Sequence, residues 1–508
     1  MNVTDVIWRH SFAFPDREAL VCDDKRATYA QLRNTIHLVS ARLYEAGVRR
    51  GDNVAISIQH PMAFLIMAFA VGRLGAAAST LSPSQDDKIK EALLDRHQVR
   101  FVIQAGKNPW RSGLRPDLVY LPMAELMAPL SGEAPAEYET AQDADELTWY
   151  IALSSGTTAV PKSIATSHQR SNLLGSLLRP EEVNARRVLL LAGHGSTWVI
   201  NFALRALYAG ATAILSTRYH DAANFFHVAA AEKPDLAVLS SGLAATVVSH
   251  AAKSDLRREA VCGSIQSVHV GGGPVSPAVI DGIRKYVCDN LWIVYGASEI
   301  GGLTALAPRD ADRGKGCVGR LHSWVEAQAV DENDQVLPAG KVGILRFKAP
   351  TMAHGYLADE GATTRAFRQG WFYPGDIGAV GVAGYLFLGG RMDQVLNIGG
   401  NKLDPYRIEA VVNKHPAILE SAVVPVADPS GMQILVAVAV PRDSFDANEV
   451  RQFCEKQLKP YEVPRAVVSV ASLPKNDNGK IMRRQVASMI KVLPPGGPDQ
   501  EGGNETVH

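Results

Sequence analysis

The sequence predicts an α/β protein with a large N-terminal domain of parallel sheets covered by helices and a small α+β domain at the C-terminus. Three observations support this fold class. The chain has 508 residues, more than one hydrophobic core usually holds. Between residues 53 and 295, short apolar runs alternate with helical stretches, as in parallel sheets whose strands are joined by helices. From about residue 302 the sequence is turn-rich and alternating, and a new pattern begins at residue 394.

The expected elements follow one another along the chain. Apolar runs predict strands at VAISI, VRFVI, VLLLA, LAVLS, IQSVHV and LWIVYG, with helices over residues 62–74, 198–209 and 277–287. A small antiparallel β subdomain follows, with a hairpin over residues 377–388 that turns at Val382 and Ala383. The last part predicts helices over residues 405–414 and 447–458 and strands over residues 421–426, 433–440 and 466–470.

These elements define the expected domain limits. Residues 1–392 are expected to form the N-terminal domain, and residues 393–490 a separate lid domain. Residues 491–508 are rich in proline, glycine and polar side chains, so we expect this tail to be disordered.

Composition limits the possible partners and the compartment. The 52 basic and 52 acidic residues balance, which argues against nucleic acid or an anionic membrane as the main partner. The cysteines are odd in number and scattered without a CxxC pair, which is typical of reduced thiols in a cytosolic protein. They are Cys22, Cys262, Cys288, Cys317 and Cys454. Charges near the N-terminus argue against a signal peptide, and the most apolar run, residues 63–78, contains Arg73. We therefore expect a cytoplasmic protein with no membrane span.

A polar loop after the strand candidate that ends at Leu153 is suited to binding phosphate. Its residues are Ser154, Ser155, Gly156, Thr157 and Thr158, and Pro161 and Lys162 close it. Hydroxyls and exposed amides can surround a polyphosphate while the lysine supplies positive charge. The spacing approaches a Walker A motif, but proline stands where that motif has glycine and has no N–H to donate, which disfavours a P-loop NTPase. Taken alone, the loop is equally consistent with an ordinary polar turn between a strand and a helix.

Four further motifs accompany the loop in a familiar order and at familiar separations. They are VYGASEIGG at 294–302, GWFYPGD at 370–376, GRMDQVLNIGGNKLDPYRIE at 390–409 and LPKNDNGKIMRR at 473–484. Together the five stretches resemble the acyl-adenylate-forming superfamily of acyl- and aryl-CoA synthetases, peptide-synthetase adenylation domains and firefly luciferase, over nearly the whole chain. The resemblance implies an ATP- and magnesium-dependent acid–thiol ligase that makes an acyl-adenylate and passes the acyl group to coenzyme A.

The resemblance also implies roles for individual residues in the nucleotide site. Residues 154–162 would hold the β- and γ-phosphates with the help of Lys162. Tyr295 would stack on adenine, Ser298 would face the α-phosphate, and Glu299 would bind magnesium, for which one or two protein carboxylates are typical. Asp376 would bind the ribose hydroxyls, Arg391 would contact ribose or phosphate, and Lys480 would act in the first half-reaction. The same site would include Gly273, Pro274 and Gly296.

The sequence departs from the family pattern at a few positions. Ala159 and Ser163 stand where glycine is usual, and Ser298 and Pro374 stand where threonine is usual. Without the other motifs, Tyr295 would be interpreted as a core residue, Glu299 as a surface charge, Asp376 as a turn residue and Lys480 as a solvated lysine.

The resemblance extends to the acceptor and acyl sites. Asp393 would be the hinge of a mobile lid, and Gly399 and Gly400 would line the tunnel for the pantetheine thiol. The acyl pocket would be lined by His194, Trp198, Ser240, Gly272, Ala297 and Gly302. His194 could equally be a core histidine. These walls offer no acidic partner for an α-amino group, so an apolar aryl or aliphatic monocarboxylic acid is favoured over an amino acid.

Two other functions stay open at this point. Only a short tail follows Lys480, so a carrier domain in cis is not expected, but a stand-alone adenylating enzyme could still load a carrier-protein thiol in trans. An inactive nucleotide-binding regulator is disfavoured by the presence of Lys480, Glu299, Asp376 and Arg391. The sequence leaves the oligomeric state open, a homodimer included.

Overall fold

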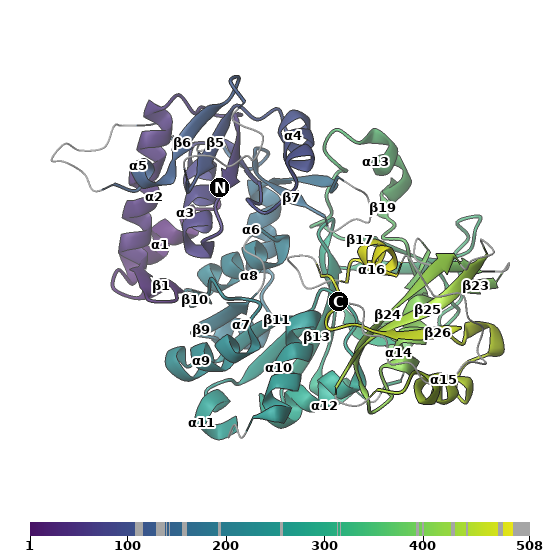
Figure 1. Cartoon of the computed structure of the whole chain (residues 1–508). Helices are drawn as coiled ribbons and strands as arrows, with labels where there is room; N and C mark the ends of the chain where they lie inside the picture. Colours follow the sequence, from purple (N-terminus) through teal and green to yellow (C-terminus); the bar gives the residue numbers. More distant parts are fainter. Residues whose placement is uncertain are drawn as a thin grey trace.

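The protein is described by a computed structural model. It covers residues 1–106, 115–128, 138, 140–141, 143–154, 160–191, 195–254, 258–311, 313–314, 316–392, 396–398, 401–427, 432–442, 445–475 and 481–490. Figure 1 shows a large N-terminal domain, coloured purple to green, and a smaller C-terminal domain, coloured yellow-green, as the sequence predicts. The exact domain limits, 1–392 and 393–490, stay predictions. The expected tail, 491–508, lies outside the described residues.

The first sheet has six strands in the order β6-β5-β3-β4-β7-β8, and only its β7–β8 pair is antiparallel. The strands are β3 (Asn53–Ser57), β4 (Ala77–Thr80), β5 (Phe101–Gln104), β6 (Val119–Pro122), β7 (Thr148–Leu153) and β8 (Ser163–Ser167). Helix α3 (Pro61–Arg73) is buried from Pro61 to Gly72, and β4 follows it. The apolar run at 63–78 is therefore a core helix followed by a strand, as expected.

The second sheet has 15 strands and begins with a mainly parallel part in the order β2-β1-β10-β9-β11-β12-β13. These strands are β1 (Glu18–Cys22), β2 (Lys25–Thr28), β9 (Arg187–Leu191), β10 (Thr212–Leu215), β11 (Leu236–Ser240), β12 (Ser267–Gly271) and β13 (Leu291–Ala297). Val188 and Leu190 of β9 face one core, while Leu189 and Leu191 face another. This alternation buries both faces, as parallel sheets require.

Helices fill both sides of the second sheet. Helices α2 (Tyr29–Glu45), α3 and α8 (Thr197–Tyr208) share one core with strands of both sheets and so lie between them. Helices α9 (Ala222–Glu232), α10 (Ser241–Lys253) and α12 (Pro277–Tyr286) pack on the opposite face. The remaining helices of this part are α1 (Asp5–Ala13), α4 (Asp87–Arg96), α5 (Met123–Leu126), α6 (His168–Ser176), α7 (Pro180–Asn184) and α11 (Arg258–Cys262).

The antiparallel subdomain that the sequence predicts is a continuation of the second sheet. From β13 the hydrogen-bonded order runs β14-β15-β21-β20-β17-β19-β18, with β16 paired to β17. The strands are β14 (Gly301–Leu306), β15 (Cys317–Leu321), β16 (Glu326–Val330), β17 (Gly343–Lys348), β18 (Phe367–Arg368), β19 (Trp371–Phe372), β20 (Asp376–Val380) and β21 (Tyr385–Arg391). Short helices η1 (Pro308–Asp310), α13 (Glu360–Ala366) and η2 (Val382–Gly384) connect them. The last of these forms the turn expected at Val382 and Ala383.

The C-terminal domain has its own cores on the two faces of a three-stranded sheet, β24-β25-β26. Its elements are β22 (Leu396–Ile398), β23 (Asn401–Leu403), α14 (Pro405–Val412), β24 (Ile418–Ala427), β25 (Gln433–Pro441), α15 (Ala447–Glu455), η4 (Pro460–Glu462), β26 (Ala466–Ser469) and α16 (Arg483–Met489). The expected helices and strands of this part are confirmed, with limits that differ by a few residues.

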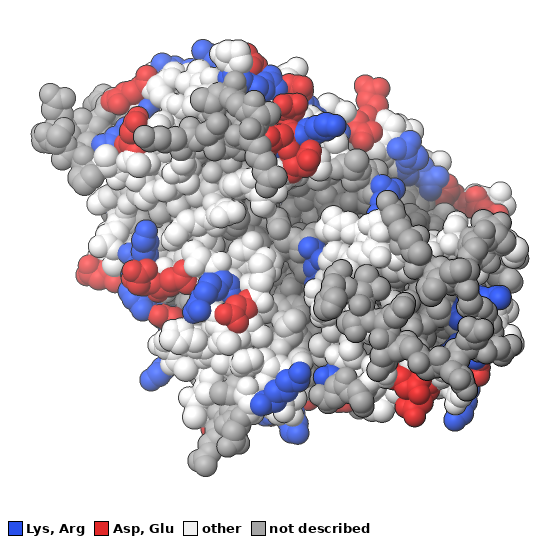
Figure 2. Space-filling model, in the orientation of Figure 1, with Lys and Arg blue, Asp and Glu red and all other residues white. Residues whose placement is uncertain are grey.

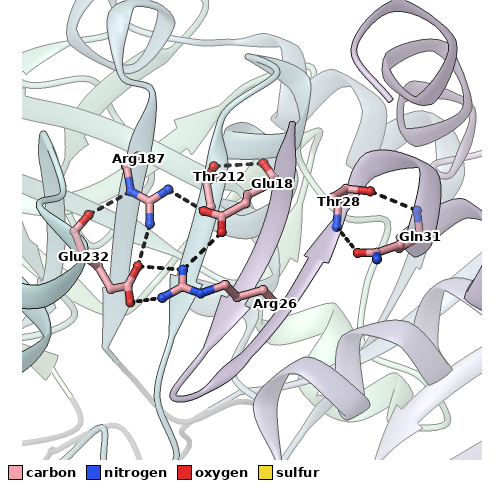
Figure 3. Close-up of polar contacts among 7 residues, drawn as sticks. All are labelled: Glu18, Arg26, Thr28, Gln31, Arg187, Thr212 and Glu232. Carbon is pink, nitrogen blue, oxygen red and sulfur yellow. Dashed lines mark hydrogen bonds and ion pairs between the residues drawn. The ribbon is translucent and has the colours of Figure 1, made fainter. Parts of the chain in front are cut away.

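A network of four charged side chains lies at the β1–β2 edge of the second sheet (Figure 3). Arg187 binds Glu18 and Glu232, each at 2.6 Å, and Arg26 binds Glu232 at 2.6 Å and Glu18 at 3.1 Å. Because the four charges bridge β1, β2, β9 and α9 as a network, they stabilise this edge more than separate surface pairs would.

Acidic and basic side chains share the surface, and the cysteines lie mainly inside the protein. On the face in Figure 2, Lys and Arg are interspersed with Asp and Glu among the coloured residues. All five cysteines are free, and four of them are buried. Within the described part of the chain, no helix combines the length and apolar character that crossing a membrane requires.

Candidate active site

The polar loop of residues 154–162 joins two antiparallel strands, β7 and β8. The backbone N–H of Ser154 donates to the carbonyl of Lys162 at 2.8 Å, and Leu153 pairs with Ser163 in register. The alternative of a turn between a strand and a helix is therefore wrong, because β8 returns alongside β7 before α6 begins. Ser155, Gly156, Thr157 and Thr158 lie outside the described residues.

Two side chains from the end of α4 bind the end of this loop. Arg96 donates to the carbonyl of Pro161 at 2.6 Å, and the ring of His97 contacts the hydroxyl of Ser163 at 2.8 Å. Burial, with a further contribution from Arg96, lowers the pKa of His97 to about 4, so its ring is neutral at pH 7. The hydroxyl at Ser163, where the family usually has glycine, therefore has a partner in the core.

Lys162 and Glu299 are linked through the side chain of Tyr356. The ammonium of Lys162 lies 4.6 Å from the centre of the Tyr356 ring, and the Tyr356 hydroxyl donates to Oε1 of Glu299 at 2.8 Å. Glu299 is 8 % exposed and Tyr356 is 9 % exposed. Burial, together with the Glu299 carboxylate, raises the pKa of Tyr356, so the phenol stays a donor. Nothing in the sequence motifs identified Tyr356, which follows the motif of Glu299 by more than fifty residues.

Arg170 binds backbone carbonyls on either side of the Glu299 site, a role that the sequence did not predict. Its guanidinium donates to the carbonyls of Ser298 and Thr351, each at 2.7 Å, and Thr351 donates to the carbonyl of Ile300 at 2.6 Å. Burial lowers the pKa of Arg170 to about 10 while the Glu299 charge opposes this shift, so the side chain stays protonated at neutral pH. The position of Glu299 is therefore set by a buried cation that comes from α6.

The turn that carries Ser298 and Glu299 depends on glycine. Gly296 faces Gly302 across the β13–β14 hairpin, and a Cβ at Gly296 would lie 2.3 Å from the carbonyl oxygen of Gly301. Gly301 has a φ of +86°, a conformation that favours glycine.

Tyr295, Asp376 and Arg391 come together from three strands. The Tyr295 hydroxyl donates to Oδ2 of Asp376. Arg391 lies directly opposite Asp376 in the β20–β21 register, and its Nη1 is 3.3 Å from Oδ1. Its Nη2 donates to the carbonyl of Pro374 at 3.0 Å, so the residue that replaces the usual threonine contributes its backbone. Burial raises the pKa of Tyr295, and the charge of Asp376 adds to this shift. Glu299 lies in the turn between β13, which carries Tyr295, and β14.

The expected acyl walls lie at the carboxyl ends of neighbouring strands, where ligands of such sheets bind. Ser240 and Gly271, the last residues of β11 and β12, are adjacent in register, and Gly271 is paired in turn with Val294 in the middle of β13. A Cβ at Gly271 would lie 2.6 Å from the indole of Trp198, and one at Gly302 would lie 3.7 Å from Nε2 of His322. The hydroxyl of Ser240 accepts from the backbone N–H of Leu243 and so caps α10.

A buried cluster of charged residues lies behind these walls and was not expected from the sequence. We call it the α7 cluster; its members are Arg179, Glu181, Glu182, Arg205 and His269. Burial raises the pKa of Glu182, but Arg179 and Arg205 outweigh it and lower the pKa to about 2. Each of the two glutamates of this cluster forms an ion pair with an arginine, Glu181 with Arg179 and Glu182 with Arg205.

Several predicted site residues lie outside the described residues. They are Ser155, Gly156, Thr157, Thr158, His194, Asp393, Gly399, Gly400 and Lys480. Among the residues that the structure does describe, no group of three or more His, Cys, Asp and Glu side chains gathers to hold a metal ion.

This fold, with these residues at the strand ends, defines an adenylate-forming enzyme of two domains. The chain belongs to the AMP-binding enzyme family, whose model matches residues 7–357, and the family's C-terminal domain matches residues 407–480. Within the family it is an acid–thiol ligase of the AMP-forming CoA-ligase type.

Three relatives illustrate the similarity. A 2-succinylbenzoate–CoA ligase of Bacillus mycoides is 25% identical over 501 residues, covering 96% of this chain and 98% of its own. The O-succinylbenzoate coenzyme A synthetase of Bacillus subtilis, solved with ATP and magnesium, has a TM-score of 0.80, 21% identity and coverage of 94% and 98%. An anthranilate CoA ligase solved with anthranoyl-AMP has a TM-score of 0.83, 23% identity and coverage of 97% of each chain. Identities of 21% and 23% to these solved structures support a shared fold, but they do not identify the acid that this chain activates.

Proposed function

We propose that this protein activates an apolar aryl or aliphatic monocarboxylic acid with ATP and then transfers the acyl group to coenzyme A. One observation carries the proposal. Tyr295, Asp376 and Arg391, the candidate residues for adenine and ribose, contact one another although they come from distant parts of the chain. Glu299, the candidate metal ligand, lies in the turn that follows the strand of Tyr295.

The nucleotide would lie along this group of residues. Asp376 would accept hydrogen bonds from the ribose hydroxyls after its contact with Tyr295 rearranges, which frees the Tyr295 ring to pack on the base. Lys162 would bind the leaving phosphates, and Ser298 would face the α-phosphate. Lys480 would add positive charge to the transition state of adenylate formation, where preorganised cations are most effective. Ser154–Thr158, Gly273, Pro274 and Gly296 would complete the site.

Magnesium fits the donor at Glu299. Its carboxylate is an oxygen ligand of the kind that this ion prefers, and Oε1 accepts a hydrogen bond from the Tyr356 hydroxyl at 2.8 Å. When bound, the ion neutralises charge on the phosphates. Glu299 would position it, and Tyr356 and Arg170 would position Glu299.

The curated relatives of this chain are CoA ligases, which favours coenzyme A as the acceptor over a carrier protein. Gly399 and Gly400 match the glycines that line the tunnel for a pantetheine thiol, which both acceptors carry, and Asp393 would let the lid turn between the two half-reactions. The second candidate function is the loading of a carrier protein in trans. An assay for the thioester product distinguishes coenzyme A from a carrier protein as the acceptor.

The test is pyrophosphate release with a panel of carboxylic acids, with and without coenzyme A. We expect release with at least one unsubstituted or neutral aryl or alkyl acid, and formation of its acyl-CoA thioester. Release that is best with free amino acids, without thioester formation on coenzyme A, would contradict the proposal and favour a carrier protein.

A further inference from the structure

The residues on both sides of Lys162 are bound to the end of helix α4. Arg96 donates to the carbonyl of Pro161 at 2.6 Å, and the ring of His97 contacts the hydroxyl of Ser163 at 2.8 Å. Ser163 is 0 % exposed and His97 is 2 % exposed, so water cannot readily replace this hydrogen bond. Two consecutive residues of the chain thus hold the backbone before and after Lys162.

Apolar packing adds to these polar contacts. Leu93 and Leu94 of α4 belong to a buried cluster against which Leu153 and Val160 pack. Leu153 is the last residue of β7, and Val160 comes two residues before Lys162. Helix α4 therefore shares one core with the chain on both sides of residues 155–159, which lie outside the described residues.

The side chain of Lys162 lies on the other side of the chain from this core. Neighbouring side chains of an extended chain point to opposite sides, and the hydroxyl of Ser163 points to α4. The ammonium of Lys162 lies 4.6 Å from the centre of the Tyr356 ring, whose hydroxyl binds Glu299. The carbonyl of Ser163 also accepts from the backbone N–H of Leu357 at 2.7 Å. Lys162 is thus held between α4 and the segment that contacts the candidate metal ligand.

The hydroxyl of Ser163 distinguishes this chain from the family pattern, which usually has glycine at that position. A glycine could not make the hydrogen bond to His97, and it would leave the backbone beside Lys162 more conformational freedom. The serine therefore restricts the end of the loop at the residue that directly follows the lysine.

We infer that Arg96 and His97 are positioning residues for Lys162. By binding Pro161 and Ser163 they fix the end of the phosphate loop, so that the ammonium meets the β- and γ-phosphates of ATP without a further change of the backbone. Charges that are already in place stabilise developing charge most effectively. This inference rests on the proposed function, in which Lys162 binds those two phosphates.

The test compares the affinities of ATP and AMP, because AMP lacks the two phosphates that Lys162 would bind. Both dissociation constants would be measured by titration calorimetry with magnesium and without any carboxylic acid. Ser163→Ala removes only the hydroxyl and should weaken ATP by about three- to tenfold, with AMP within about twofold of wild type. Ser163→Gly, which also frees the backbone, should weaken ATP further. Lys162→Ala gives the size of the full effect.

Variants of His97 test the same hydrogen bond from its other side. His97→Phe should weaken ATP as Ser163→Ala does, whereas His97→Gln should retain ATP affinity, because an amide can both donate and accept. Ser163→Ala combined with Lys162→Ala should bind ATP no more weakly than Lys162→Ala alone, since the serine acts through the lysine. A loss of general stability would not give this result.

Ser171→Ala is a matched control. Ser171 is 1 % exposed, and its hydroxyl accepts from the ring N–H of Trp149 at 2.7 Å, so the variant loses a buried hydrogen bond of the same kind away from the phosphate loop. It should keep the wild-type ratio of ATP to AMP affinity.

The two half-reactions give a second readout. Pyrophosphate has left before the thioester forms, so Ser163→Ala should slow pyrophosphate release by about tenfold and leave thioester formation from a supplied acyl-adenylate within about twofold of wild type.

The outcomes separate this inference from the proposed function. If Ser163→Ala folds and keeps the wild-type ratio of ATP to AMP affinity, the inference is wrong and the CoA-ligase proposal stands. The same holds if AMP is weakened as much as ATP, because the effect then extends beyond the phosphates. If Lys162→Ala leaves ATP affinity unchanged, the role assigned to Lys162 is wrong and the inference fails with it. If the wild-type protein binds neither nucleotide, the proposed function itself fails.

Discussion

Tyr356→Phe tests whether the hydrogen bond between Tyr356 and Glu299 positions the metal ligand. The bond is 2.8 Å long, and both side chains are less than one tenth exposed, so water cannot readily replace the lost donor. A hydrogen bond to a charged group contributes about 1.5–3 kcal/mol. Since about 1.4 kcal/mol corresponds to a tenfold change in rate, kcat/KM for MgATP should fall by about ten- to a hundredfold.

The assay is ATP–pyrophosphate exchange at varied magnesium concentration, with the best acid of the panel. The phenylalanine ring keeps its contact with Lys162, so Tyr356→Leu, which removes the ring as well, should be more severely impaired. Tyr373→Phe is a matched control, because its hydroxyl contacts Arg346 and Asp334, each at 3.0 Å, away from Glu299. If Tyr356→Phe folds and its exchange rate stays within about twofold of wild type, the positioning role is refuted.

The other predictions concern the lid, the acceptor and pH. Lys480→Ala should abolish adenylate formation but spare thioester formation from a supplied acyl-adenylate, and an equal loss in both half-reactions would contradict its role. Asp393→Pro fixes one backbone angle and should impair one half-reaction far more than the other, whereas equal effects would exclude a hinge there. Gly400→Leu should keep pyrophosphate release and reduce acyl-CoA production; equal losses of both would argue against a tunnel. Burial lowers the pKa of both His97 and His322 to about 4, so the unfolded chain binds more protons as pH falls from 6.5 to 4. Stability should then fall by roughly 1.4 kcal/mol per pH unit per histidine in that range, and a Tm that is equal at pH 7 and pH 5 would refute this.

The sequence predicted the fold well wherever apolar periodicity was strong. The strand at residues 236–240 and the helix at 405–412 lie where their patterns placed them. The sequence did not predict that the parallel and antiparallel parts of the second sheet are joined. This join is the pairing of β13 with β14, which depends on close contact of Gly296, Gly301 and Gly302. Local periodicity records which residues are apolar, but it does not record which strand edges meet.

The same limit applies to the candidate site. Motif residues such as Asp376 and Arg391 lie together, as the resemblance implied. Arg170, Tyr356 and His269 lie outside those motifs, and each acts through a contact with a residue far away in the sequence. A buried arginine cannot be told from a surface arginine by its neighbours in the chain. Its importance becomes visible only when the carbonyl or carboxylate that it binds is placed beside it.

The continuity of the second sheet has a consequence for how the reaction must be organised in space. Strands β20 and β21, which carry Asp376 and Arg391, are hydrogen-bonded through β15 and β14 to β13, and β13 adjoins β12 and its acyl wall. Residues of one continuous sheet would thus bind both the ribose and the acyl group of an adenylate. The newly made anhydride would stay in one place, and the thiol would have to travel to it. A variant that weakens the pairing between these strands should release the adenylate into solution before the thiol binds. The released adenylate would hydrolyse, so ATP would be consumed without thioester formation.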